Sequence, residues 1–388
     1  MDAPLQGLRI VELARILAGP WIGQTFADLG ADVVKVESPG GDDTRRWGPP
    51  FVAGADGAPQ DAAYYHSCNR GKRSVVADFR SADDLAFVGR LIARADVVVE
   101  NFKTGALTKY GLDYATLAAR QPRLVYCSVT GFGQTGPYAG RPGYDAMIQA
   151  MGGVMDLTGE QDGGPQKIGV AIADLFTGVF GVVAIQAALA QRERTGRGQH
   201  IDMALLDVMT AVLAYQALNY LVSGEAPRRL GNAHPNIVPY QSFAVADGHV
   251  MVAVGNDEQF RRFCAVLGQP AFATEPRYAS NELRVRNRAE LVPALAAVLA
   301  GRRRDELLVR LEAAGVPAGP INTVQDVFAD PQVVDRGLKI ELQAPSTARG
   351  CVPTVRTPIR FSDAELALGR PSPRLGEHTA EVRRELGL

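Results

Sequence analysis

Short apolar runs alternate with longer segments of helical spacing along the first 150 residues. The apolar runs predict strands, and they are LRIVEL (8–13), ADVVKVE (31–37), KRSVVADF (72–79), DVVVENF (96–102) and RLVYCSV (123–129). The segments between them predict helices, the first over residues 19–30 with Pro20 near its start and Gly30 at its end. Strands that alternate with helices are typical of right-handed crossovers in a mostly parallel sheet. The pattern therefore predicts a large α/β domain with a Rossmann-like sheet.

A long apolar segment follows, and Asp174 is its only charged residue between positions 168 and 190. Such a length is about that of one membrane span. However, Gly169, Gly178, Gly181 and the aspartate make a poor span, and the polar stretch QRERTGRGQ follows directly. We therefore predict a buried core helix and no membrane partner. Residues 198–224 are predicted to continue helically.

A Pro- and Asn-rich connection after residue 224 predicts a domain boundary. We expect a large α/β domain over residues 1–224, a small domain with linkers over 225–325, and a C-terminal segment over 326–388 that returns to the large domain. The small domain is expected to be α+β, with a strand at 248–254, a loop at 255–259 and helices between 258 and 315.

Composition narrows the possible partners and compartment. The chain of 388 residues has 41 Lys and Arg against 42 Asp and Glu, so no overall charge favours nucleic acid or a membrane surface. Its 4 cysteines lie far apart, without the spacing of a metal site or a disulfide framework. The opening MDAPLQGLRIVELA is acidic at position two, unlike a signal peptide. We expect a cytoplasmic protein without a metal.

The stretch SVTGFGQTGPYAG contains Gly131, Gly133 and Gly136 in the spacing of the dinucleotide fingerprint G-x-G-x-x-G. That fingerprint requires a helix to open at the third glycine. Pro137 and Pro142 lack backbone donors and further glycines interrupt any helix, so we predict a loop. An NAD-dependent oxidoreductase is the alternative that this stretch leaves open.

Cationic residues gather in or beside the loops where a parallel sheet receives ligands. They are Arg15, Arg45, Arg46, Lys72, Arg73, Lys103 and Lys109. Arg and Lys form charge-assisted hydrogen bonds to phosphate. As a set these residues indicate a nucleotide-like anion, although each one alone is also typical of a solvated surface.

Asp174 lies in IADLFTG, at or near the start of the long apolar helix. As an N-cap it would accept backbone N–H bonds and need no further role. A carboxylate partly removed from water is also a potential nucleophile that forms covalent acyl intermediates. Spacing alone favours the cap and leaves the nucleophile open.

Eight stretches together resemble class III CoA-transferases, the group that includes formyl-CoA:oxalate CoA-transferase and carnitine CoA-transferase. They are GLRIVELARILAGP, DLGADVVKVESPGGDDTR, NRGKRSVVADF, VENFKTGALTKYGLDY, GFGQTGPYAGRPGYD, IADLFTG, RERTGRGQHIDMALLD and AAGVPAGPINTVQDVFADPQV. They occur in the family's order over about residues 7 to 335. Their combination is far more specific than any single motif.

The resemblance implies that acyl-CoA thioesters and small carboxylic acids are the substrates, with no tightly bound cofactor. Asp174 matches the family's nucleophile. The residues implied to line the pantetheine and acyl region are Arg15, Ile16, Ala18, Gly131, Phe132 and Gly133, and those implied to hold the adenosine and phosphates are Lys72, Arg73, Asn101, Phe102 and Lys109. The family also implies an interlocked homodimer, with each site between the large domain of one chain and the small domain of the other.

The implied reaction passes through an aspartyl-CoA thioester, and its tetrahedral oxyanions need donors, which we expect from backbone N–H groups of the glycine-containing loops.

Two departures from family members narrow the choice of substrate and reaction. The oxalate-specific member has a glycine-rich mobile lid where this chain has GNDEQ at residues 255–259. This loop is stiffer and acidic, which argues against oxalate as the substrate. Racemases of α-methylacyl-CoA have His-Asp where this chain has Tyr144-Asp145, and loss of that His removes one of two acid–base groups. The loop GDDTRRWGPPF looks most like the branch that includes succinyl-CoA:glutarate CoA-transferase, which suggests a dicarboxylate acceptor, with the racemase as an alternative.

Overall fold

The computed structural model describes residues 2–388 and divides them into two compact units. The large unit comprises residues 2–154, 167–223 and 332–388, and the small unit comprises 155–166 and 224–331. The small domain expected over 225–325 falls within the small unit. That unit also takes in 155–166, which the sequence pattern had assigned to the large domain.

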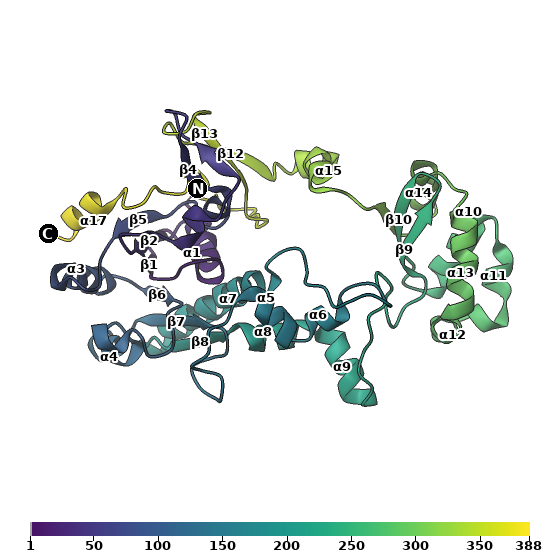
Figure 1. Ribbon diagram of the computed structural model, residues 1–388, viewed down its shortest axis with the longest axis horizontal. Coiled ribbons are helices and arrows are strands. Elements are labelled where there is room, and N and C mark those ends of the chain that lie inside the picture. The colour runs from purple at the N-terminus through teal and green to yellow at the C-terminus, as the bar shows by residue number, and fades with distance from the viewer. Residues whose placement is uncertain (1) are drawn as a thin grey trace. The chain divides into compact units, whose positions relative to one another are not determined.

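A six-stranded parallel sheet forms the centre of the large unit, with the strand order β5-β2-β1-β6-β7-β8 (Figure 1). Its strands are β1 (Arg9–Glu12), β2 (Asp32–Glu37), β5 (Arg73–Val76), β6 (Val97–Glu100), β7 (Val125–Thr130) and β8 (His200–Ala204). This order is that of Rossmann-type sheets, in which the chain reverses direction across the sheet between the two central strands. Here the reversal falls between β1 and β6, and ligands bind beyond the carboxyl ends of strands at such a point.

The sixth strand, β8, was not expected, because residues 198–224 were predicted to be helical throughout. Residues His200–Ala204 instead pair with β7, with Tyr126 opposite His200 and Thr130 opposite Ala204. Two shorter helices follow, α8 (Leu205–Val212) and α9 (Ala214–Ser223). The side chains of β8 are mostly half-buried and that of Asp202 is exposed, so the strand lacks the apolar run that identified the others.

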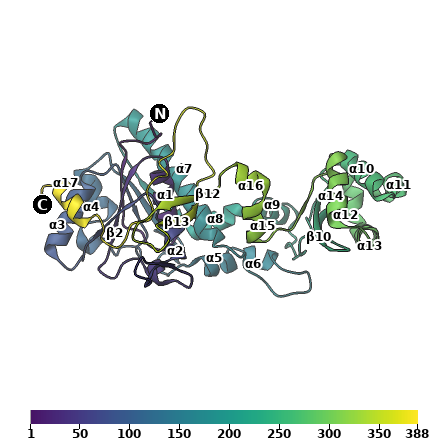
Figure 2. The same ribbon diagram turned by 90° about the horizontal axis from the view of Figure 1, so that it is seen from above.

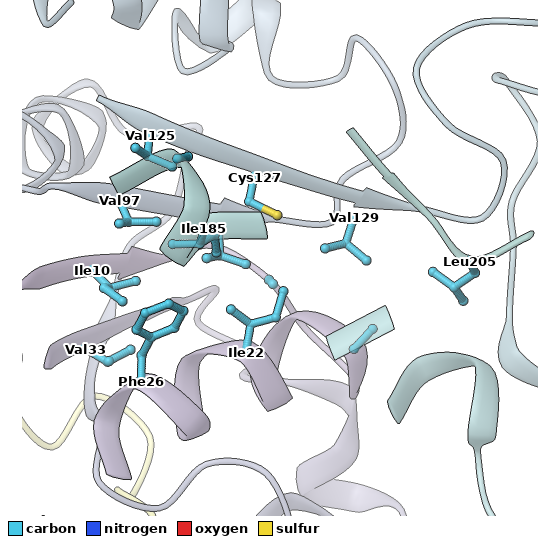
Figure 3. Packing of buried hydrophobic residues seen from close by; sticks show 14 of the residues in the cluster. Ile10, Ile22, Phe26, Val33, Val97, Val125, Cys127, Val129, Ile185 and Leu205 are labelled. Carbon is cyan, nitrogen blue, oxygen red and sulfur yellow. The ribbon is translucent and has the colours of Figure 1, made fainter. Parts of the chain in front are cut away.

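Helices cover both faces of the sheet. On one face lie α1 (Ala18–Asp28), α5 (Asp145–Met151), α7 (Ile172–Thr195) and α8, which share one buried cluster with the strands. Figure 3 shows Phe26 of α1 pointing toward Ile10 and Val33 of the sheet. On the other face lie α3 (Ala82–Ile92), α4 (Tyr114–Arg120) and α17 (Thr379–Glu385), with a second cluster. The large unit is therefore a three-layer α/β structure.

The helix α7 is, within residues 2–388, the single helix that is long and apolar enough to cross a membrane, and α8 with α9 passes the same test only as a bent pair. One side of α7 packs closely against α1. A Cβ atom at Gly178 would lie 2.9 Å from Cδ1 of Trp21 and 3.1 Å from the carbonyl oxygen of Ala18. The glycines of the long apolar segment therefore allow the two helices to approach.

The small unit contains an antiparallel sheet of β9 (Tyr240–Val245), β10 (Gly248–Ala253) and β11 (Ala318–Pro320). Its helices gather beside β10 (Figure 2), and they are α10 (Asp257–Leu267), α11 (Pro270–Thr274), α12 (Asn281–Arg286), α13 (Arg288–Leu299) and α14 (Arg304–Ala313). The expected loop at 255–259 is only partly a loop. Asn256 caps α10 through the N–H of Gln259, so residues 257–259 form its first helical turn.

The other elements are short. They are η1 (Asp43–Arg46), β3 (Phe51–Ala53), β4 (Pro59–Ala62), α2 (Ala63–His66), η2 (Thr108–Tyr110), α6 (Val154–Leu157), η3 (Pro276–Tyr278), α15 (Val324–Ala329), α16 (Pro331–Asp335), β12 (Lys339–Gln343) and β13 (Cys351–Val355). The C-terminal segment, which has little periodicity, thus contributes a β12–β13 hairpin and α17 to the large unit.

Candidate active site

A cavity of about 210 Å³ lies beyond the carboxyl ends of β1, β6 and β7, beside the reversal point of the sheet. The loops after these strands line it together with the first turn of α7. The expected site residues that it brings together are Arg15, Ile16, Ala18, Asn101, Phe102, Gly131 and Asp174. Residues from six separate segments of the chain therefore converge where the sheet topology places a ligand.

Asp174 is the third residue of α7 and does not cap it. The N-cap residue is Ala171, whose methyl side chain cannot accept a hydrogen bond. Asp145, the first residue of α5, supplies the missing acceptor, because its Oδ1 atom accepts the backbone N–H of Ala173 at 2.8 Å. Its Oδ2 atom accepts a bond from Gln149 at 2.7 Å. The capping role that spacing favoured for Asp174 is therefore wrong, and its own carboxylate is held by no hydrogen bond or ion pair found within residues 2–388.

Burial, and after it the negative charge of Asp145, raise the pKa of the Asp174 carboxyl to about 7. Both causes disfavour the ionised form. The group therefore changes its charge near neutral pH, and as a carboxylate it is poorly solvated. A carboxylate in that condition is suited to attack a carbonyl carbon.

Tyr64, at the second position of α2, belongs to the same surroundings although the sequence gave no reason to name it. Burial raises the pKa of its phenol, and the Asp174 charge is the next largest cause. The phenol therefore stays protonated and can donate a hydrogen bond. Tyr64 also packs edge-on against Trp47, with ring centroids 5.2 Å apart.

The loop after β1 is held rigidly at the cavity. Asn101 binds the backbone of Arg15 in both directions, accepting its N–H at 2.9 Å and donating to its carbonyl at 2.7 Å. Ile16 has a φ of 75°, a left-handed conformation that is rare for a β-branched residue. Asp42 accepts the Ile16 N–H at 3.3 Å and forms a buried ion pair with Lys35. Strained backbone that its neighbours hold in place is typical of functional sites.

The glycine-containing loop after β7 is not a dinucleotide-binding turn. No helix begins at Gly136, and the next helix is α5, at Asp145. Gly131 instead lies against Gly143, since a Cβ atom on Gly131 would be 2.6 Å from the Cα atom of Gly143. The requirement of the NAD alternative for a helix at the third glycine is therefore not met.

Two expected residues of this loop stand beside the cavity and do not line it. Phe132 packs edge-on against Tyr138, with centroids 5.5 Å apart, and Gly133 donates its N–H to Oγ1 of Thr130 at 2.9 Å. The N–H of Gln134 is likewise donated to Asp202. Both N–H groups already donate to side-chain oxygens of the protein. The expectation that the N–H groups of this loop stabilise oxyanions is therefore wrong for Gly133 and Gln134.

The structure contradicts the phosphate-binding role expected for Lys72 and Arg73. Lys72 is fully buried, and its Nζ atom contacts Glu12 at 2.8 Å and the carbonyl oxygen of Pro20 at 2.8 Å. Arg73 begins β5, and its guanidinium is 2.6 Å from Asp32 at the opening residue of β2. Neither side chain lines the cavity, because each already neutralises a carboxylate elsewhere.

Two other cations flank an aromatic group that leads away from the cavity. Phe102, which lines the cavity, stacks on Phe79 with centroids 6.1 Å apart, and Phe79 contacts Tyr110 at 5.3 Å. The Nζ atom of Lys109 lies 4.7 Å from the centre of the Tyr110 ring. Arg80 follows β5 and has an 85% exposed side chain, which forms an ion pair with Asp78 at 2.7 Å. The sequence pattern missed Arg80, although residues that follow a parallel strand belong to the ligand edge.

The comparison with protein families decides the classification. The model of CoA-transferase family III matches residues 5–379. This chain belongs to CoA-transferase family III. It is 57% identical over 99% of its length to succinate--glutarate CoA-transferase of Agrobacterium fabrum, covering 96% of that protein. It is 43% identical over 99% of its length to succinyl-CoA:glutarate CoA-transferase of Mus musculus, covering 86% of that protein.

A solved structure agrees with the family assignment. The crystal structure of a CAIB/BAIF family protein from Brucella suis is 60% identical, with a TM-score of 0.88 and complete coverage of both chains. As a family III member, the chain is an acyl-CoA:carboxylate CoA-transferase, and CoA thioesters are its substrates. Tyr144, which stands where racemases have His, lines the cavity with a 63% exposed side chain. As a class, phenols are poorer bases than imidazoles for proton abstraction at neutral pH.

Proposed function

We propose that this CoA-transferase moves CoA from succinyl-CoA to a small dicarboxylate such as glutarate, with Asp174 as the covalent nucleophile. The observation that carries the proposal is the position of Asp174, which lies in the cavity at the ligand edge of the sheet with a pKa of about 7 and no bond to its carboxylate within residues 2–388. The acids named for the most similar relatives support the choice of substrates.

The reaction balances with the groups of this site and its two substrates. An oxygen of Asp174 attacks the thioester carbonyl, and the carbon–sulfur bond breaks to give a mixed anhydride and CoA thiolate. The thiolate attacks the aspartyl carbonyl, which releases the first acid as its carboxylate and leaves an aspartyl-CoA thioester. The acceptor carboxylate then reverses both steps, forming the new acyl-CoA and freeing Asp174.

The aromatic group beside the cavity supports a path for the CoA chain. The acyl end would lie at Asp174, the pantetheine would pass Arg15, Ile16 and Ala18, and the adenosine and phosphates would lie toward Lys109 and Arg80. Lys109 keeps the role expected from its sequence, and Arg80 takes the role expected for Lys72 and Arg73. The exposed pair of Arg80 with Asp78 can give way to a phosphate, whereas the fully buried pair of Lys72 with Glu12 cannot.

The finer architecture is also a proposal: two chains form an interlocked homodimer, in which the small domain of one completes the site of the other. Two features of the large unit support it. Apolar side chains are exposed on α7 and α9, with Val183 at 60%, Leu218 at 55% and Leu221 at 72%. A groove of about 910 Å³ between α7 and β13 is lined by His66, whose buried ring nitrogens have no hydrogen-bond partner in the described structure. Apolar surface of this extent is typical of an interface.

Mass spectrometry of the reaction products tests the proposed substrates. The enzyme is incubated with succinyl-CoA and a panel of free acids, and with other acyl-CoAs and glutarate. We expect glutaryl-CoA and free succinate as the fastest products. Faster transfer from or to monocarboxylic acids would remove the dicarboxylate assignment, while leaving the family assignment in place.

A further inference from the structure

Three cationic side chains line the cavity that contains Asp174, and they differ in what already neutralises them. They are Arg15, Lys103 and Arg141. Arg15 forms an ion pair with Asp43 at 2.9 Å. Arg141 has no ion pair and no side-chain hydrogen bond to any residue of the described chain. Its donors are therefore available to a ligand.

The guanidinium of Arg141 is held in place by an aromatic ring and not by a carboxylate. Its Cζ atom lies 3.9 Å from the centre of the Tyr138 ring, and Tyr138 is itself packed edge-on by Phe132. Stacking on a ring fixes the plane of a guanidinium and leaves its N–H groups free at the edge. The side chain is thus oriented before any ligand arrives.

Geometry distinguishes Arg141 from Lys103. A guanidinium presents two parallel N–H bonds that match the two oxygens of a carboxylate, whereas an ammonium acts as a point charge. Lys103 also lines a second cavity, of about 310 Å³, together with the buried carboxylate of Glu100. Its charge is therefore shared between two cavities. Arg141 lines only the cavity of Asp174 among those described here.

We propose that Arg141 binds the distal carboxylate of a dicarboxylic acyl group whose other end reacts at Asp174. This inference rests on the proposed dicarboxylate function and assigns a residue to its selectivity. Arg141 and Asp174 line the same cavity, so both ends of a short diacid can be bound within one site. A monocarboxylic acyl group leaves the guanidinium without a partner, so Arg141 favours diacids over monoacids.

A guanidinium binds phosphate as well as carboxylate. The phosphates of CoA are therefore the alternative ligand of Arg141, and the experiment has to separate the two. The experiment compares kcat/KM for succinyl-CoA and for butyryl-CoA, which has the same four-carbon chain without the distal carboxylate. Both contain the same phosphates, so any contact of Arg141 with CoA cancels in the ratio. The variants are Arg141→Gln and Arg141→Lys, and Arg120→Gln is the control, which removes an exposed positive charge from the end of α4.

We expect Arg141→Gln to lower kcat/KM for succinyl-CoA by about 10- to 100-fold, as for loss of hydrogen bonds to a charged group. The value for butyryl-CoA should stay within about twofold, and Arg141→Lys should lie between. If the wild type does not turn over butyryl-CoA, its inhibition constant against succinyl-CoA serves as the same reference and should not change in Arg141→Gln.

Two results would overturn the proposal. An equal fall for both thioesters assigns Arg141 to the CoA phosphates, and an unchanged ratio with unchanged rates assigns it no role in binding. A wild type that does not prefer succinyl-CoA over butyryl-CoA is a separate outcome, because it refutes the dicarboxylate function itself. Far-ultraviolet circular dichroism and melting temperatures verify that the Arg141 and Arg120 variants are folded.

Discussion

Asp145 and Asp174 meet at the amino end of α7, where Oδ1 of Asp145 accepts the backbone N–H of Asp174 at 3.4 Å beside its shorter bond from Ala173. One carboxylate thus caps the helix that carries the other. The arrangement leaves the side chain of Asp174 free of capping duty, and it also places a second negative charge near the proposed nucleophile. Position and reactivity of Asp174 therefore both depend on Asp145.

The rate of CoA transfer should depend on pH through Asp174. Burial and then the charge of Asp145 raise its pKa from 3.8 to about 7, and the ionised form is the nucleophile. We expect kcat/KM to be constant above pH 8 and to fall about tenfold per pH unit below pH 7. Steady-state assays between pH 5 and 9 in buffers of constant ionic strength measure this profile. A profile that is flat from pH 5 to 9 would contradict an essential carboxylate with this pKa.

Replacement of Asp145 separates its charge from its capping bond. Asp145→Asn keeps an oxygen that can accept the N–H of Ala173 but removes the charge, so the acid limb of the pH profile should move to lower pH. The limb should not reach the ordinary value of a carboxyl, because burial is the larger cause. Asp145→Ala also removes the acceptor and should lower the free energy of unfolding by about 1 kcal/mol, as measured by denaturant titration. An unshifted acid limb in Asp145→Asn would count against the electrostatic coupling.

The contribution of Lys109 should appear in KM. An exposed charge that contacts a CoA phosphate interacts alike with the ground and transition states, so Lys109→Ala should raise KM for acyl-CoA by about five- to tenfold with little change in kcat. Arg80→Ala should behave in the same way. Lys339→Ala, on the exposed strand β12, is the matched control. Loss of kcat with an unchanged KM would exclude the phosphate-binding role.

The sequence was sufficient for the fold wherever burial dictates the pattern. Strands β1 and β6 are covered on both faces, so Ile10 and Val97 belong to continuous apolar runs that are readily identified. The edge strand β8 contains His200 and Asp202 and leads directly into α8, so its local pattern resembles the start of a helix. The assignment of residues 155–166 to the small unit depends on tertiary contacts that no local pattern records.

The site was predictable where topology alone positions a residue. Arg15 follows β1, and the rule for parallel sheets identified it; Asn101, which follows β6, was named from the family resemblance. Charge alone misled for Lys72, because its partner Glu12 is 60 residues away in sequence. Asp145 and Tyr64 act through contacts made only in the folded chain. A sequence shows that a cation or carboxylate is present, but not what already neutralises it.

The homodimer should persist at very low concentration. Interlocked chains cannot separate without unfolding, so sedimentation velocity at nanomolar concentration should show one species of twice the chain mass. Val183→Asp introduces a charge on the exposed face of α7 and should reduce assembly or yield of folded protein, whereas Val309→Asp, at a 67% exposed position of α14, should not. Folded monomer of the wild type would exclude the interlocked arrangement.

Replacement of Asp174 by asparagine separates a nucleophile from a structural carboxyl. Asp174→Asn keeps the size of the side chain and, because Asp145 caps α7, leaves the helix start unchanged. Because its pKa is raised on folding, Asp174 stabilises the folded state most when it is protonated. This contribution to the free energy of unfolding is full below the unfolded pKa of 3.8 and is lost as the pH rises through about 7. The Asn variant should therefore have an equal or higher melting temperature than the wild type at pH 8.

Its transfer activity should nevertheless fall by at least about a thousandfold, because an amide cannot form the anhydride or the aspartyl thioester. Binding of acyl-CoA, followed by isothermal titration, should be retained. In the wild type, hydroxylamine added during turnover with succinyl-CoA should modify the peptide that contains Asp174, as detected by mass spectrometry, and Asp207, in the first turn of α8, serves as the internal control that should stay unmodified. Deamidation of Asn back to Asp would restore activity slowly, so a second variant, Asp174→Ser, is measured in parallel. Substantial transfer by both variants, with the mass of each verified, would falsify the covalent role of Asp174.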